Sequence, residues 1–346
     1  MESLSPTPAR VTIHDVARAA SVSRQTVSNA LKHPERLSPQ TLDRVLAAID
    51  DLGYEPSSSA QSLRSQRSGA IGVEVNTLGP RAHNETMAPF LCSLGVRATE
   101  HDCHVVPFGS TLAEPMLRGY EEMWRRRLVD AFIIADTHHG DPRPEWLEAR
   151  GIPFAAFGRV WDDPTFTRWV DVDGAAGTRA AVRHCLDRGY TTIGYLGWPK
   201  GSVVGDDRRS GWRVACEAAS PDVAGPEASC EQDLDEAIAA ATALIHTLPH
   251  GSAVVCASDV LALGVHQALL ASGRGVGTDV GVVGFDGSET ARMHHITTLA
   301  QPLADIADLA LTLVHDALAG AGRPSTGTIL APRLLIGRST GPLARP

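Results

Sequence analysis

Apolar side chains recur every three or four positions in three stretches near the start of the chain, which predicts three short amphipathic helices. The apolar positions are Ile13, Val16, Ala17 and Ala20 in the first; Val27, Ala30 and Leu31 in the second; and Leu42, Val45, Leu46, Ile49 and Leu52 in the third. Only Ser21 and Val22 separate the first two stretches. The pattern therefore predicts a helix-turn-helix within a small bundle.

Residues that favour helix ends stand at the ends of these stretches. Thr12, Ser23 and Ser38 occupy the N-cap positions, where a hydroxyl oxygen can accept a hydrogen bond from a first-turn N–H. Pro39 follows Ser38 at the first helical position, and Gly53 closes the third helix.

The second helix carries a polar face without a carboxylate. Its members are Arg24, Gln25, Thr26, Ser28 and Asn29. Donors and amides of this kind suit a surface of phosphates and base edges. The face therefore favours nucleic acid as a partner.

A polar segment of small residues follows Gly53 and ends at Gly69. Leu63 is an isolated large apolar residue within it. The segment is either a plain linker or a stretch that becomes helical only on a partner. Residues 1–10 are rich in Pro and Ser and are expected to be disordered.

From Ala70 onward, short apolar runs alternate with helical stretches, which predicts βαβ units and parallel sheets. The runs are 70–75, 104–108, 131–135, 154–157, 193–196, 253–256 and 280–285. About 275 residues are many for one such sheet, so two similar lobes are expected. A ligand would bind between them, at the carboxyl ends of the strands.

Composition restricts the class of protein further. The chain has 346 residues and a net charge of −9, but residues 1–68 hold eight Lys/Arg against seven Asp/Glu, so the acidic excess lies elsewhere. A net charge of +1 is small for a nucleic-acid-binding unit, so that reading depends on the motif. The sequence contains no apolar run of about 18 residues, so no membrane span is predicted. Six scattered cysteines and no export signal favour buried thiols in the cytoplasm.

The ordered motifs resemble the lactose-repressor/galactose-repressor family of bacterial transcription regulators along nearly the whole chain from Val11. The N-terminal matches are Val11–Ala17, Val22–Leu31, Leu37–Thr41, Leu52–Pro56 and Ala60–Leu63. Later matches are Gly189–Gly194, Arg208–Trp212, Ala257–Gly264, Val283–Asp286 and Ile296–Pro302. A lone helix-turn-helix pattern is a weak signal, whereas this ordered set is specific. The resemblance implies an all-α headpiece followed by a two-lobed α/β domain like the periplasmic binding proteins.

The resemblance also implies roles in DNA binding for named residues. Arg24, Gln25 and Asn29 would reach base edges in the major groove, since Arg suits guanine and amides suit adenine. Leu63, with the small Ala60 before it, would insert into the minor groove and kink the DNA. The residues that match backbone-contacting positions are Thr12, Ser23, Thr26, Ser28, Ser38 and Tyr54. Ser57–Ser59 departs from the family pattern, which could weaken phosphate contacts.

In the lobed domain the resemblance implies that Arg208 and Asp286 hold ligand oxygens, with Arg159 and Ser258 at pocket-lining positions. An Arg and an Asp that face each other across a cleft could also form a plain salt bridge. Three tryptophans, Trp161, Trp198 and Trp212, could stack on a sugar, and Trp212 fits the core better. Gly174 and Gly287 stand where the family has Asn and a second Asp. The lost carboxylate widens the range of ligand classes.

Other chemistry finds little support in the sequence. Glycine-rich nucleotide loops, the HExxH zinc motif and the GxSxG nucleophile motif are all missing, so neither an enzyme, a cofactor nor a metal site is predicted. The alternative is a two-lobed solute-binding protein, which would leave residues 11–68 without a role. The leading interpretation is a cytoplasmic repressor that binds double-stranded operator DNA as a homodimer or dimer of dimers and responds to a small ligand, a sugar by preference.

The expected domain boundaries follow from these patterns. A disordered N-terminus (1–10) precedes the helix-turn-helix domain (11–56) and a hinge (57–68). The effector-binding and dimerisation domain (69–346) divides into an N-lobe (about 69–172 and 300–326) and a C-lobe (about 173–299 and 327–346).

Overall fold

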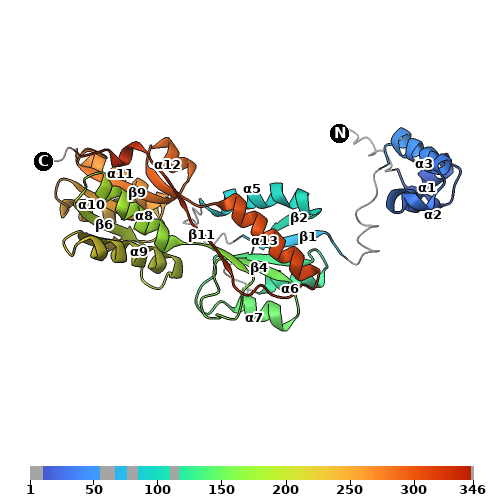
Figure 1. Ribbon diagram of the computed structural model, residues 1–346, viewed down its shortest axis with the longest axis horizontal. Helices are drawn as coiled ribbons and strands as arrows, with labels where there is room; N and C mark the ends of the chain where they lie inside the picture. Colours follow the sequence, from blue (N-terminus) through green and yellow to red (C-terminus); the bar gives the residue numbers. More distant parts are fainter. Residues whose placement is uncertain (1–10, 55–66, 76–84, 110–116, 344–346) are drawn as a thin grey trace, which may run out of the picture. The chain divides into compact units, whose positions relative to one another are not determined.

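A computed structural model describes the chain except for residues 1–10, 55–66, 76–84, 110–116 and 344–346 (Figure 1). The chain divides into two compact units, Met1–Ser68 and Gly69–Pro346. Each unit has its own hydrophobic core. None of the helices in the described part of the chain is both long and apolar enough to span a lipid bilayer.

The first unit is a three-helix bundle. Its elements are α1 (Ile13–Ala19), α2 (Arg24–Lys32), the 3-10 turn η1 (Pro34–Arg36) and α3 (Pro39–Leu52). Val16, Val27 and Val45, one from each helix, are fully buried at the centre of the bundle. These valines occupy the apolar positions that the sequence pattern places on one face of each helix, which confirms the predicted helix-turn-helix.

The caps of this unit form as the sequence predicts. Ser23 and Ser38 accept hydrogen bonds from the backbone N–H groups of Thr26 and Thr41, at 3.1 and 3.4 Å. Gly53 ends α3 in the left-handed region, at φ 59°, where a residue without Cβ is least strained. The caps fix the start of the short polar helix α2 and both ends of the longer α3.

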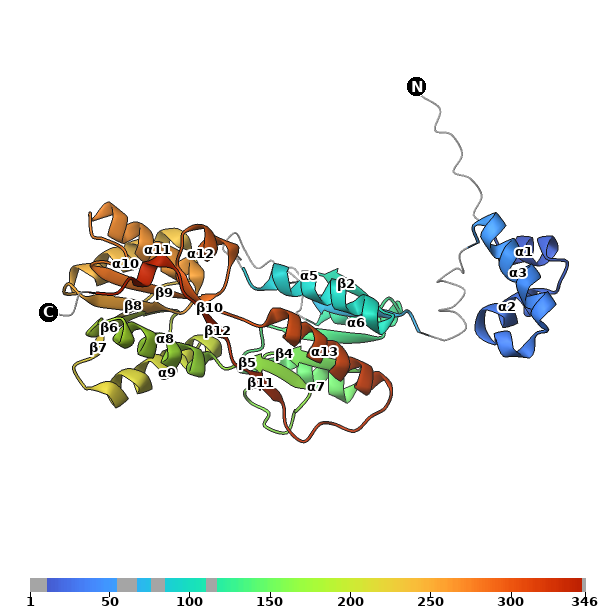
Figure 2. The ribbon, with the colours of Figure 1, turned by 45° about the horizontal axis from the view of Figure 1, so that its top comes forward.

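The second unit contains two six-stranded sheets, which lie in separate lobes (Figures 1 and 2). The first sheet has the order β11-β5-β4-β3-β1-β2 and the second β12-β10-β9-β8-β6-β7. The first-sheet strands are β1 (Ala70–Glu74), β2 (His104–Phe108), β3 (Ala131–Ala135), β4 (Phe154–Phe157), β5 (Trp169–Val172) and β11 (Thr328–Leu330). The second-sheet strands are β6 (Thr192–Gly197), β7 (Ala224–Ser229), β8 (Ser252–Cys256), β9 (Val280–Asp286), β10 (Thr297–Ala300) and β12 (Arg333–Leu335).

Helices cover both faces of each sheet. In the first lobe these are α5 (Met87–Ala98), α6 (Arg118–Arg125), α7 (Pro142–Ala149) and α13 (Leu303–Leu318). In the second lobe they are α8 (Gly174–Asp187), α9 (Val203–Ala219), α10 (Leu234–His246), α11 (Asp259–Ala271) and α12 (Glu289–Met293). Two short 3-10 turns complete the unit: η2 (Thr99–His101), which follows α5, and η3 (Arg338–Thr340), near the C-terminus. Strand β3 shows why two layers are needed, because Phe132 and Ile134 pack in one cluster and Ile133 in the other. A parallel strand buried on both faces therefore reads as a continuous apolar run.

The chain passes between the lobes three times. It leaves the first sheet after β5, returns between β10 and α13, and crosses again between β11 and β12. Strand β11 pairs with β5 in the first lobe, so the last crossing lies after Leu330 and not at 326/327 as the sequence pattern suggested. The short, largely exposed β11 has no apolar run that would mark its lobe in the sequence. The described strands pair in parallel except for β12, which is antiparallel to β10.

Candidate functional site

Helix α2 presents the polar face that the sequence predicts for DNA reading. Arg24 and Gln25 are exposed, whereas Val27 and Ala30 on the opposite face are buried. Gln25 Nε2 donates to Asn29 Oδ1 at 3.0 Å, which holds the two amides one turn apart in a common direction. Three side chains with base-reading chemistry therefore share one short helix.

The residues predicted to contact the DNA backbone lie around the ends of the same helices. The Ser23 hydroxyl lies 2.9 Å from that of Thr26, and Ser38 makes the same contact with Thr41. Thr12 caps α1, and its hydroxyl donates to Asp15 at 2.6 Å, which lowers the pKa of that carboxyl. Ser28 is half-buried on α2, and Tyr54 is half-buried against the bundle core. The hinge residues Ala60 and Leu63 lie outside the described residues.

A cavity of about 890 Å³ opens between the lobes of the second unit. The side chains that line it follow the carboxyl ends of strands in both sheets, as expected for a two-lobed α/β protein. From the first lobe they include Glu74, Asp136, His138, Arg159, Trp161 and Asp171, and from the second Trp198, Lys200, Asp207, Arg208, Glu231, Gln232 and Asp286. Gln301, at the crossing after β10, lies between the two groups.

Arg208 projects from α9 into this cavity and is only 5% exposed. Its guanidinium lies 3.6 Å from the ring centre of Phe285, and its Nη1 donates to the carbonyl of Ala257. Nη1 also lies 3.5 Å from Asp286 Oδ1, which is a weak ion pair. Among the described residues Arg208 Nε has no hydrogen-bond partner. A buried guanidinium donor without a partner is costly, so this position favours an oxygen-bearing ligand.

Asp286 ends β9 with φ 122°, a conformation rarely adopted by a residue other than glycine. Its carboxylate accepts a hydrogen bond from Gln301 Nε2 at 2.7 Å. Burial raises the pKa of Asp286, although the nearby Arg208 opposes that rise. Arg208 and Asp286 both belong to the second lobe, so they do not face each other across the cleft as the sequence analysis allowed. They form one wall, with a cation and an acceptor side by side.

Behind this wall lies a second carboxyl, that of Asp259 on α11. Burial and the neighbouring Asp286 raise its pKa to about 7. Its oxygens accept hydrogen bonds from the Thr298 hydroxyl at 2.6 Å and from the Ser288 N–H at 2.7 Å. The two carboxyls therefore repel each other inside the second lobe, and the protonated form of Asp259 relieves that repulsion.

Arg159 reaches the cavity from the first lobe. It follows Gly158, whose φ of 114° is accessible mainly to glycine and turns the chain after β4 toward the cleft. Arg159 Nε donates to Asp171 at 2.7 Å, and its guanidinium lies 4.1 Å from the ring centre of Trp161. Burial raises the pKa of Asp171, and Arg159 counters that rise. Arg159 thus lies at a pocket-lining position, as predicted.

Ser258 does not line the cavity, and that prediction is wrong. Its side chain is fully buried, because it caps α11 by accepting a hydrogen bond from the Leu261 N–H. The Ser258 hydroxyl donates to Gln232 Oε1 at 2.8 Å, and Gln232 also accepts from Trp198 Nε1 at 2.7 Å. Ser258 therefore orients the side-chain amide of Gln232, which lines the cavity.

Sequence reasoning missed a buried charge network beneath the first lobe's side of the cavity. Glu74, at the end of β1, accepts hydrogen bonds from Tyr120 at 2.9 Å and from Arg143 at 3.0 Å. Arg143 also pairs with Asp141 at 2.7 Å and is 2% exposed. The only signal in the sequence is a glutamate that ends an otherwise apolar strand. Its partners lie 46 and 69 residues away and become neighbours through the fold alone.

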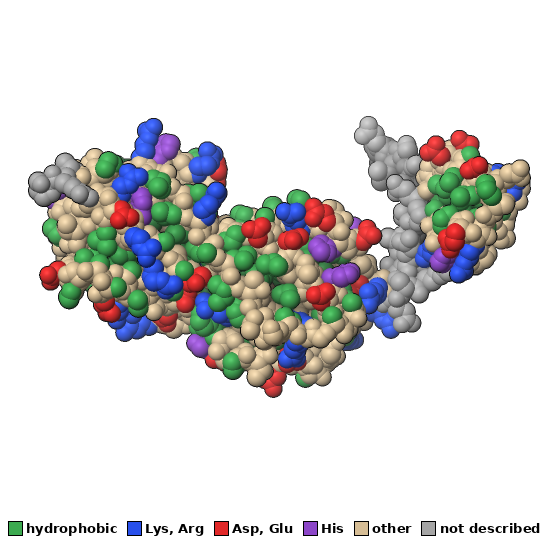
Figure 3. Space-filling model, viewed as in Figure 1, with side chains coloured by type: hydrophobic (Ala, Val, Ile, Leu, Met, Phe, Trp, Pro, Cys, Tyr) green, Lys and Arg blue, Asp and Glu red, His purple; other side chains and the backbone are tan. Residues whose placement is uncertain are grey.

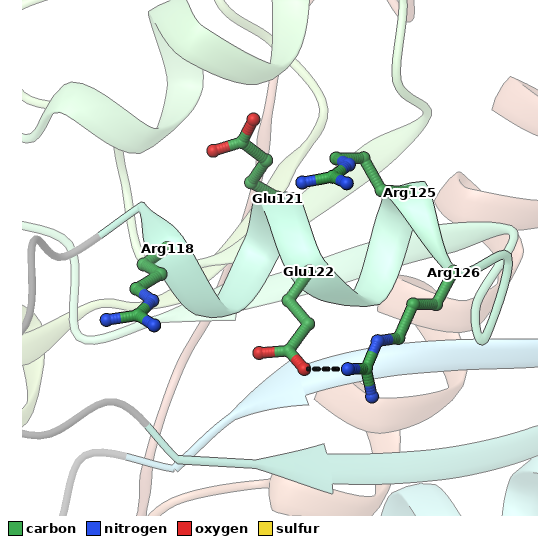
Figure 4. Close-up of a pocket in the computed structure, with 5 residues that line it drawn as sticks. All are labelled: Arg118, Glu121, Glu122, Arg125 and Arg126. Atoms are coloured by element: carbon green, nitrogen blue, oxygen red, sulfur yellow. Dashed lines mark ion pairs between the residues drawn. The ribbon is translucent and has the colours of Figure 1, made fainter.

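A second, smaller depression lies along α6. Five charged side chains line it, and all come from one stretch of helix: Arg118, Glu121, Glu122, Arg125 and Arg126 (Figure 4). Glu122 and Arg126 form an exposed ion pair at 3.1 Å, one helical turn apart. No apolar side chain lines this depression, so it is a solvated helix face and not a ligand site. Figure 3 shows the same mixture of charges elsewhere on the visible surface of the second unit.

The described residues also bear on metal binding. Within the described ranges no group of three or more His, Cys, Asp or Glu side chains is placed to hold a metal ion. The cysteines of the second lobe are buried or half-buried thiols, and burial raises the pKa of Cys185 to about 12 and of Cys230 to about 11. These thiols are packing residues.

A helix-turn-helix bundle with an exposed polar face on α2, and a two-lobed domain with a cavity between its lobes, are typical of DNA-binding regulators that respond to small molecules. Comparisons with known proteins agree. Residues 12–57 match the model of bacterial regulatory proteins of the lacI family, and residues 182–340 match a periplasmic binding protein-like domain.

Relatives match along most of the chain. The ribose operon repressor of Halalkalibacterium halodurans is 30% identical over 305 residues, which cover 88% of this chain and 89% of that protein. The transcriptional regulator CelR of Thermobifida fusca is 29% identical over 95% of this chain and 98% of its own. A solved CelR–cellobiose complex is 27% identical, with a TM-score of 0.68 over 95% of this chain and all of that one.

The chain therefore belongs to the lacI family of bacterial regulatory proteins. It is a DNA-binding transcriptional regulator and not an enzyme.

Proposed function

We propose that this regulator is a repressor that binds a pseudo-palindromic operator as a homodimer or a dimer of dimers, and that a sugar in the inter-lobe cavity lowers its affinity for DNA. Names of similar proteins support this: one relative is a ribose operon repressor, and one similar structure is a complex with cellobiose. In a symmetric dimer, two copies of α2 would read half-sites about one helical turn apart.

On the DNA side, Arg24, Gln25 and Asn29 read base edges, and the hydroxyls near the helix N-termini hold phosphates. The amide pair of Gln25 and Asn29 supports joint reading of adjacent bases, since one side chain fixes the other. Hydroxyls at helix N-termini suit anions because the first-turn N–H groups point the same way. Leu63, with the small Ala60 before it in the sequence, inserts into the minor groove and bends the operator.

On the effector side, Arg208 and Asp286 hold ligand hydroxyls. The observation that carries this part is the unpartnered Nε of the buried Arg208 inside a cavity lined by both lobes. Asp286 beside it accepts hydrogen bonds, so one sugar hydroxyl can donate to Asp286 while a neighbouring oxygen accepts from Arg208. Arg159 completes the site from the other lobe.

Control of DNA binding then follows from the lobes. A ligand that touches both lobes binds one lobe arrangement better than another, and only this difference in affinity can shift the population. A shift in the lobes changes how the two hinges of a dimer are presented to the operator. In this proposal the arrangement that the ligand favours is the one that releases the DNA.

A gel-shift experiment tests the proposal. DNA recovered by selection from a random library should contain two inverted half-sites, and addition of the effective saccharide should weaken binding at least about tenfold. Arg208→Ala should bind the same DNA and no longer respond to the saccharide. Arg209→Ala is the matched control, because Arg209 lies next on α9 and pairs with Glu227 at 2.6 Å outside the cavity.

Two results would contradict the proposal. Selected DNA without an inverted repeat argues against a symmetric dimer. An unchanged response in Arg208→Ala places the effector elsewhere.

A further inference from the structure

Each lobe presents one indole to the cavity, and an arginine lies near each. In the first lobe, Arg159 lies over Trp161 at 4.1 Å from the ring centre, and both line the cavity. In the second lobe, Arg208 lies 5.4 Å from the ring centre of Trp198. Indole rings are the side chains on which the apolar face of a sugar ring packs well, because they are flat and lose little conformational freedom. Two candidate stacking surfaces therefore line the cavity, one indole from each lobe, and an arginine lies over one face of each ring.

The two indoles are held differently. Trp198 Nε1 donates to Gln232 at 2.7 Å, and this hydrogen bond fixes the ring beside Arg208. Trp161 Nε1 is buried and has no hydrogen-bond partner among the described residues. A buried indole N–H without a hydrogen-bond acceptor is uncommon in proteins, because leaving a buried donor unpaired costs free energy. The first-lobe indole thus differs from Trp198 in having an N–H group that no described residue accepts.

The cavity is too large for one sugar ring. Its volume of about 890 Å³ would hold roughly 30 water molecules at about 30 Å³ each. It lies near the upper end of the range for ligand pockets, about 300–1,000 Å³. A single ring at Arg208 and Asp286 would leave the side next to Trp161 filled with water.

The charge of the lining restricts the ligand further. Among the described residues, seven carboxylate side chains line the cavity against three side chains of Lys and Arg. Arg159 is already engaged with two of those carboxylates, Asp171 at 2.7 Å and Asp207 at 3.4 Å. An anionic ligand would enter a field that is already negative, which costs free energy, whereas neutral hydroxyls find many acceptors.

We infer that the effector is a neutral oligosaccharide of at least two rings. One ring binds beside Trp198, with its hydroxyls on Arg208 and Asp286, and the next ring stacks on Trp161. This inference rests on the proposed function, in that it takes a saccharide to bind in the cavity. It adds that Trp161 selects for chain length and that the ligand joins the lobes by occupying one stacking surface on each. A monosaccharide would occupy one lobe only and would therefore close the cleft poorly.

Calorimetric titration of the full chain tests this. The probes are glucose, the disaccharides cellobiose and maltose, the trisaccharides cellotriose and maltotriose, and glucose 6-phosphate as the anion. We expect the best disaccharide or trisaccharide to bind at least about tenfold more tightly than glucose, and glucose 6-phosphate to bind no better than glucose.

Variants locate the second ring. Trp161→Ala should lower the affinity for the best oligosaccharide about tenfold and leave the affinity for glucose within about twofold of wild type. Trp198→Ala should lower the affinity for both sugars. Trp161→Phe keeps a stacking ring without the N–H, so its affinity should lie between those of wild type and Trp161→Ala. Trp146→Ala is the matched control, because Arg150 lies 4.2 Å from the Trp146 ring in the same arrangement away from the cavity.

The outcomes separate the two levels of the proposal. If glucose binds as tightly as any oligosaccharide, if glucose 6-phosphate binds more tightly than the neutral probes, or if Trp161→Ala weakens glucose equally, the two-ring inference is overturned while a sugar effector stands. If every saccharide fails to bind, or Arg208→Ala binds them all as wild type does, the sugar effector itself is overturned. A thermal unfolding midpoint within about 3 °C of wild type shows that each variant is folded.

Discussion

Arg159 Nη2 of the first lobe lies 3.4 Å from Asp207 Oδ2 of the second lobe. The same guanidinium holds Asp171 of its own lobe at 2.7 Å. One cation therefore joins the end of a first-lobe strand to Asp207 on a second-lobe helix, and Asp207 directly precedes Arg208, which we propose holds the ligand. Because both partners of the cross-lobe pair are only about a fifth exposed, its strength is sensitive to how closely the lobes approach.

This pair predicts an effect of charge removal on effector binding. Asp207→Asn should lower the affinity for the effective saccharide about threefold to tenfold. The reason is that the arrangement in which the two lobes lie close together loses an attraction of about 1 kcal/mol. The amide can still accept the hydrogen bond that the Ala175 N–H gives to Asp207, so the start of α8 should stay intact. Calorimetric titration of wild type and variant measures the difference.

A neighbouring aspartate provides the control. Asp206 is exposed and accepts from the Gly201 N–H within its own lobe at 3.0 Å. Asp206→Asn should leave saccharide affinity unchanged. Equal losses in the two variants would mean that general charge, and not the cross-lobe contact, sets the affinity.

The buried network at Glu74 predicts a large loss of stability. Arg143→Met removes the cation that faces Glu74 at 3.0 Å and Asp141 at 2.7 Å, and leaves two buried carboxylates without it. Breaking a buried pair in this way costs about 3–5 kcal/mol. In a unit of this size each kcal/mol shifts the unfolding midpoint by roughly 2–4 °C, so a fall of about 6–20 °C is expected in a thermal melt.

Arg126→Met on α6 is the exposed counterpart. Its pair with Glu122 is solvated (Figure 4), and such pairs contribute at most about 1 kcal/mol. Its melt should stay within about 3 °C of wild type. If the unfolding midpoint of Arg143→Met equals that of Arg126→Met, the buried ion pairs of Arg143 contribute no more to stability than an exposed pair does.

The fold could be predicted where apolar residues repeat with a regular period. The three helices of the first unit and seven strands of the second all appear where the apolar pattern places them. Strands β5, β7, β10, β11 and β12 were not predicted. They are short or lie at sheet edges, and β7 contains both glycine and proline and is partly exposed. An edge strand needs no continuous apolar run, so it leaves little signal.

The candidate site divides along similar lines. Resemblance placed Arg208, Asp286 and Arg159 at the cavity, and the structure brings all three to its wall. Ser258 was misplaced because a hydroxyl at a helix N-cap reads the same in sequence whether it turns outward or inward. Glu74 and Gln301 escaped notice because their roles depend on partners from other elements: Tyr120 on α6 and Arg143 on α7 for Glu74, and Asp286 at the end of β9 for Gln301. Pairings of this kind are set by topology, which local pattern does not encode.

Helix α2 predicts two distinguishable effects on DNA binding. Arg24→Ala should cost about 1–3 kcal/mol and relax preference at one base pair, since its exposed guanidinium is proposed to read guanine. Ser23→Ala should instead weaken binding to all sequences alike and cost about 1 kcal/mol of headpiece stability, because Ser23 caps the Thr26 N–H at 3.1 Å. Competition gel shifts with single-base-pair operator variants separate the two. A uniform loss for Arg24→Ala would exclude a base contact.

The carboxyl pair at the cavity wall predicts a pH dependence of stability. Burial and Asp286 raise the pKa of Asp259 to about 7, whereas an unfolded Asp titrates near 4. Between about pH 4 and pH 7 the folded chain binds a proton at Asp259 that the unfolded chain has released. The stability that this proton gives to the fold is complete below about pH 4 and is lost as the pH rises through 7.

Asp259→Asn tests this pH dependence. The variant imitates the protonated form, because an amide can donate to the Thr298 oxygen and accept from the Ser288 N–H. The stability of the variant relative to wild type should therefore increase from pH 5 to pH 8, by on the order of a few kcal/mol. Urea unfolding at each pH measures this difference, and Asp286→Asn should move the transition to lower pH by removing the repelling charge. Parallel pH profiles for wild type and Asp259→Asn would show that Asp259 stays ionised in the fold throughout this range.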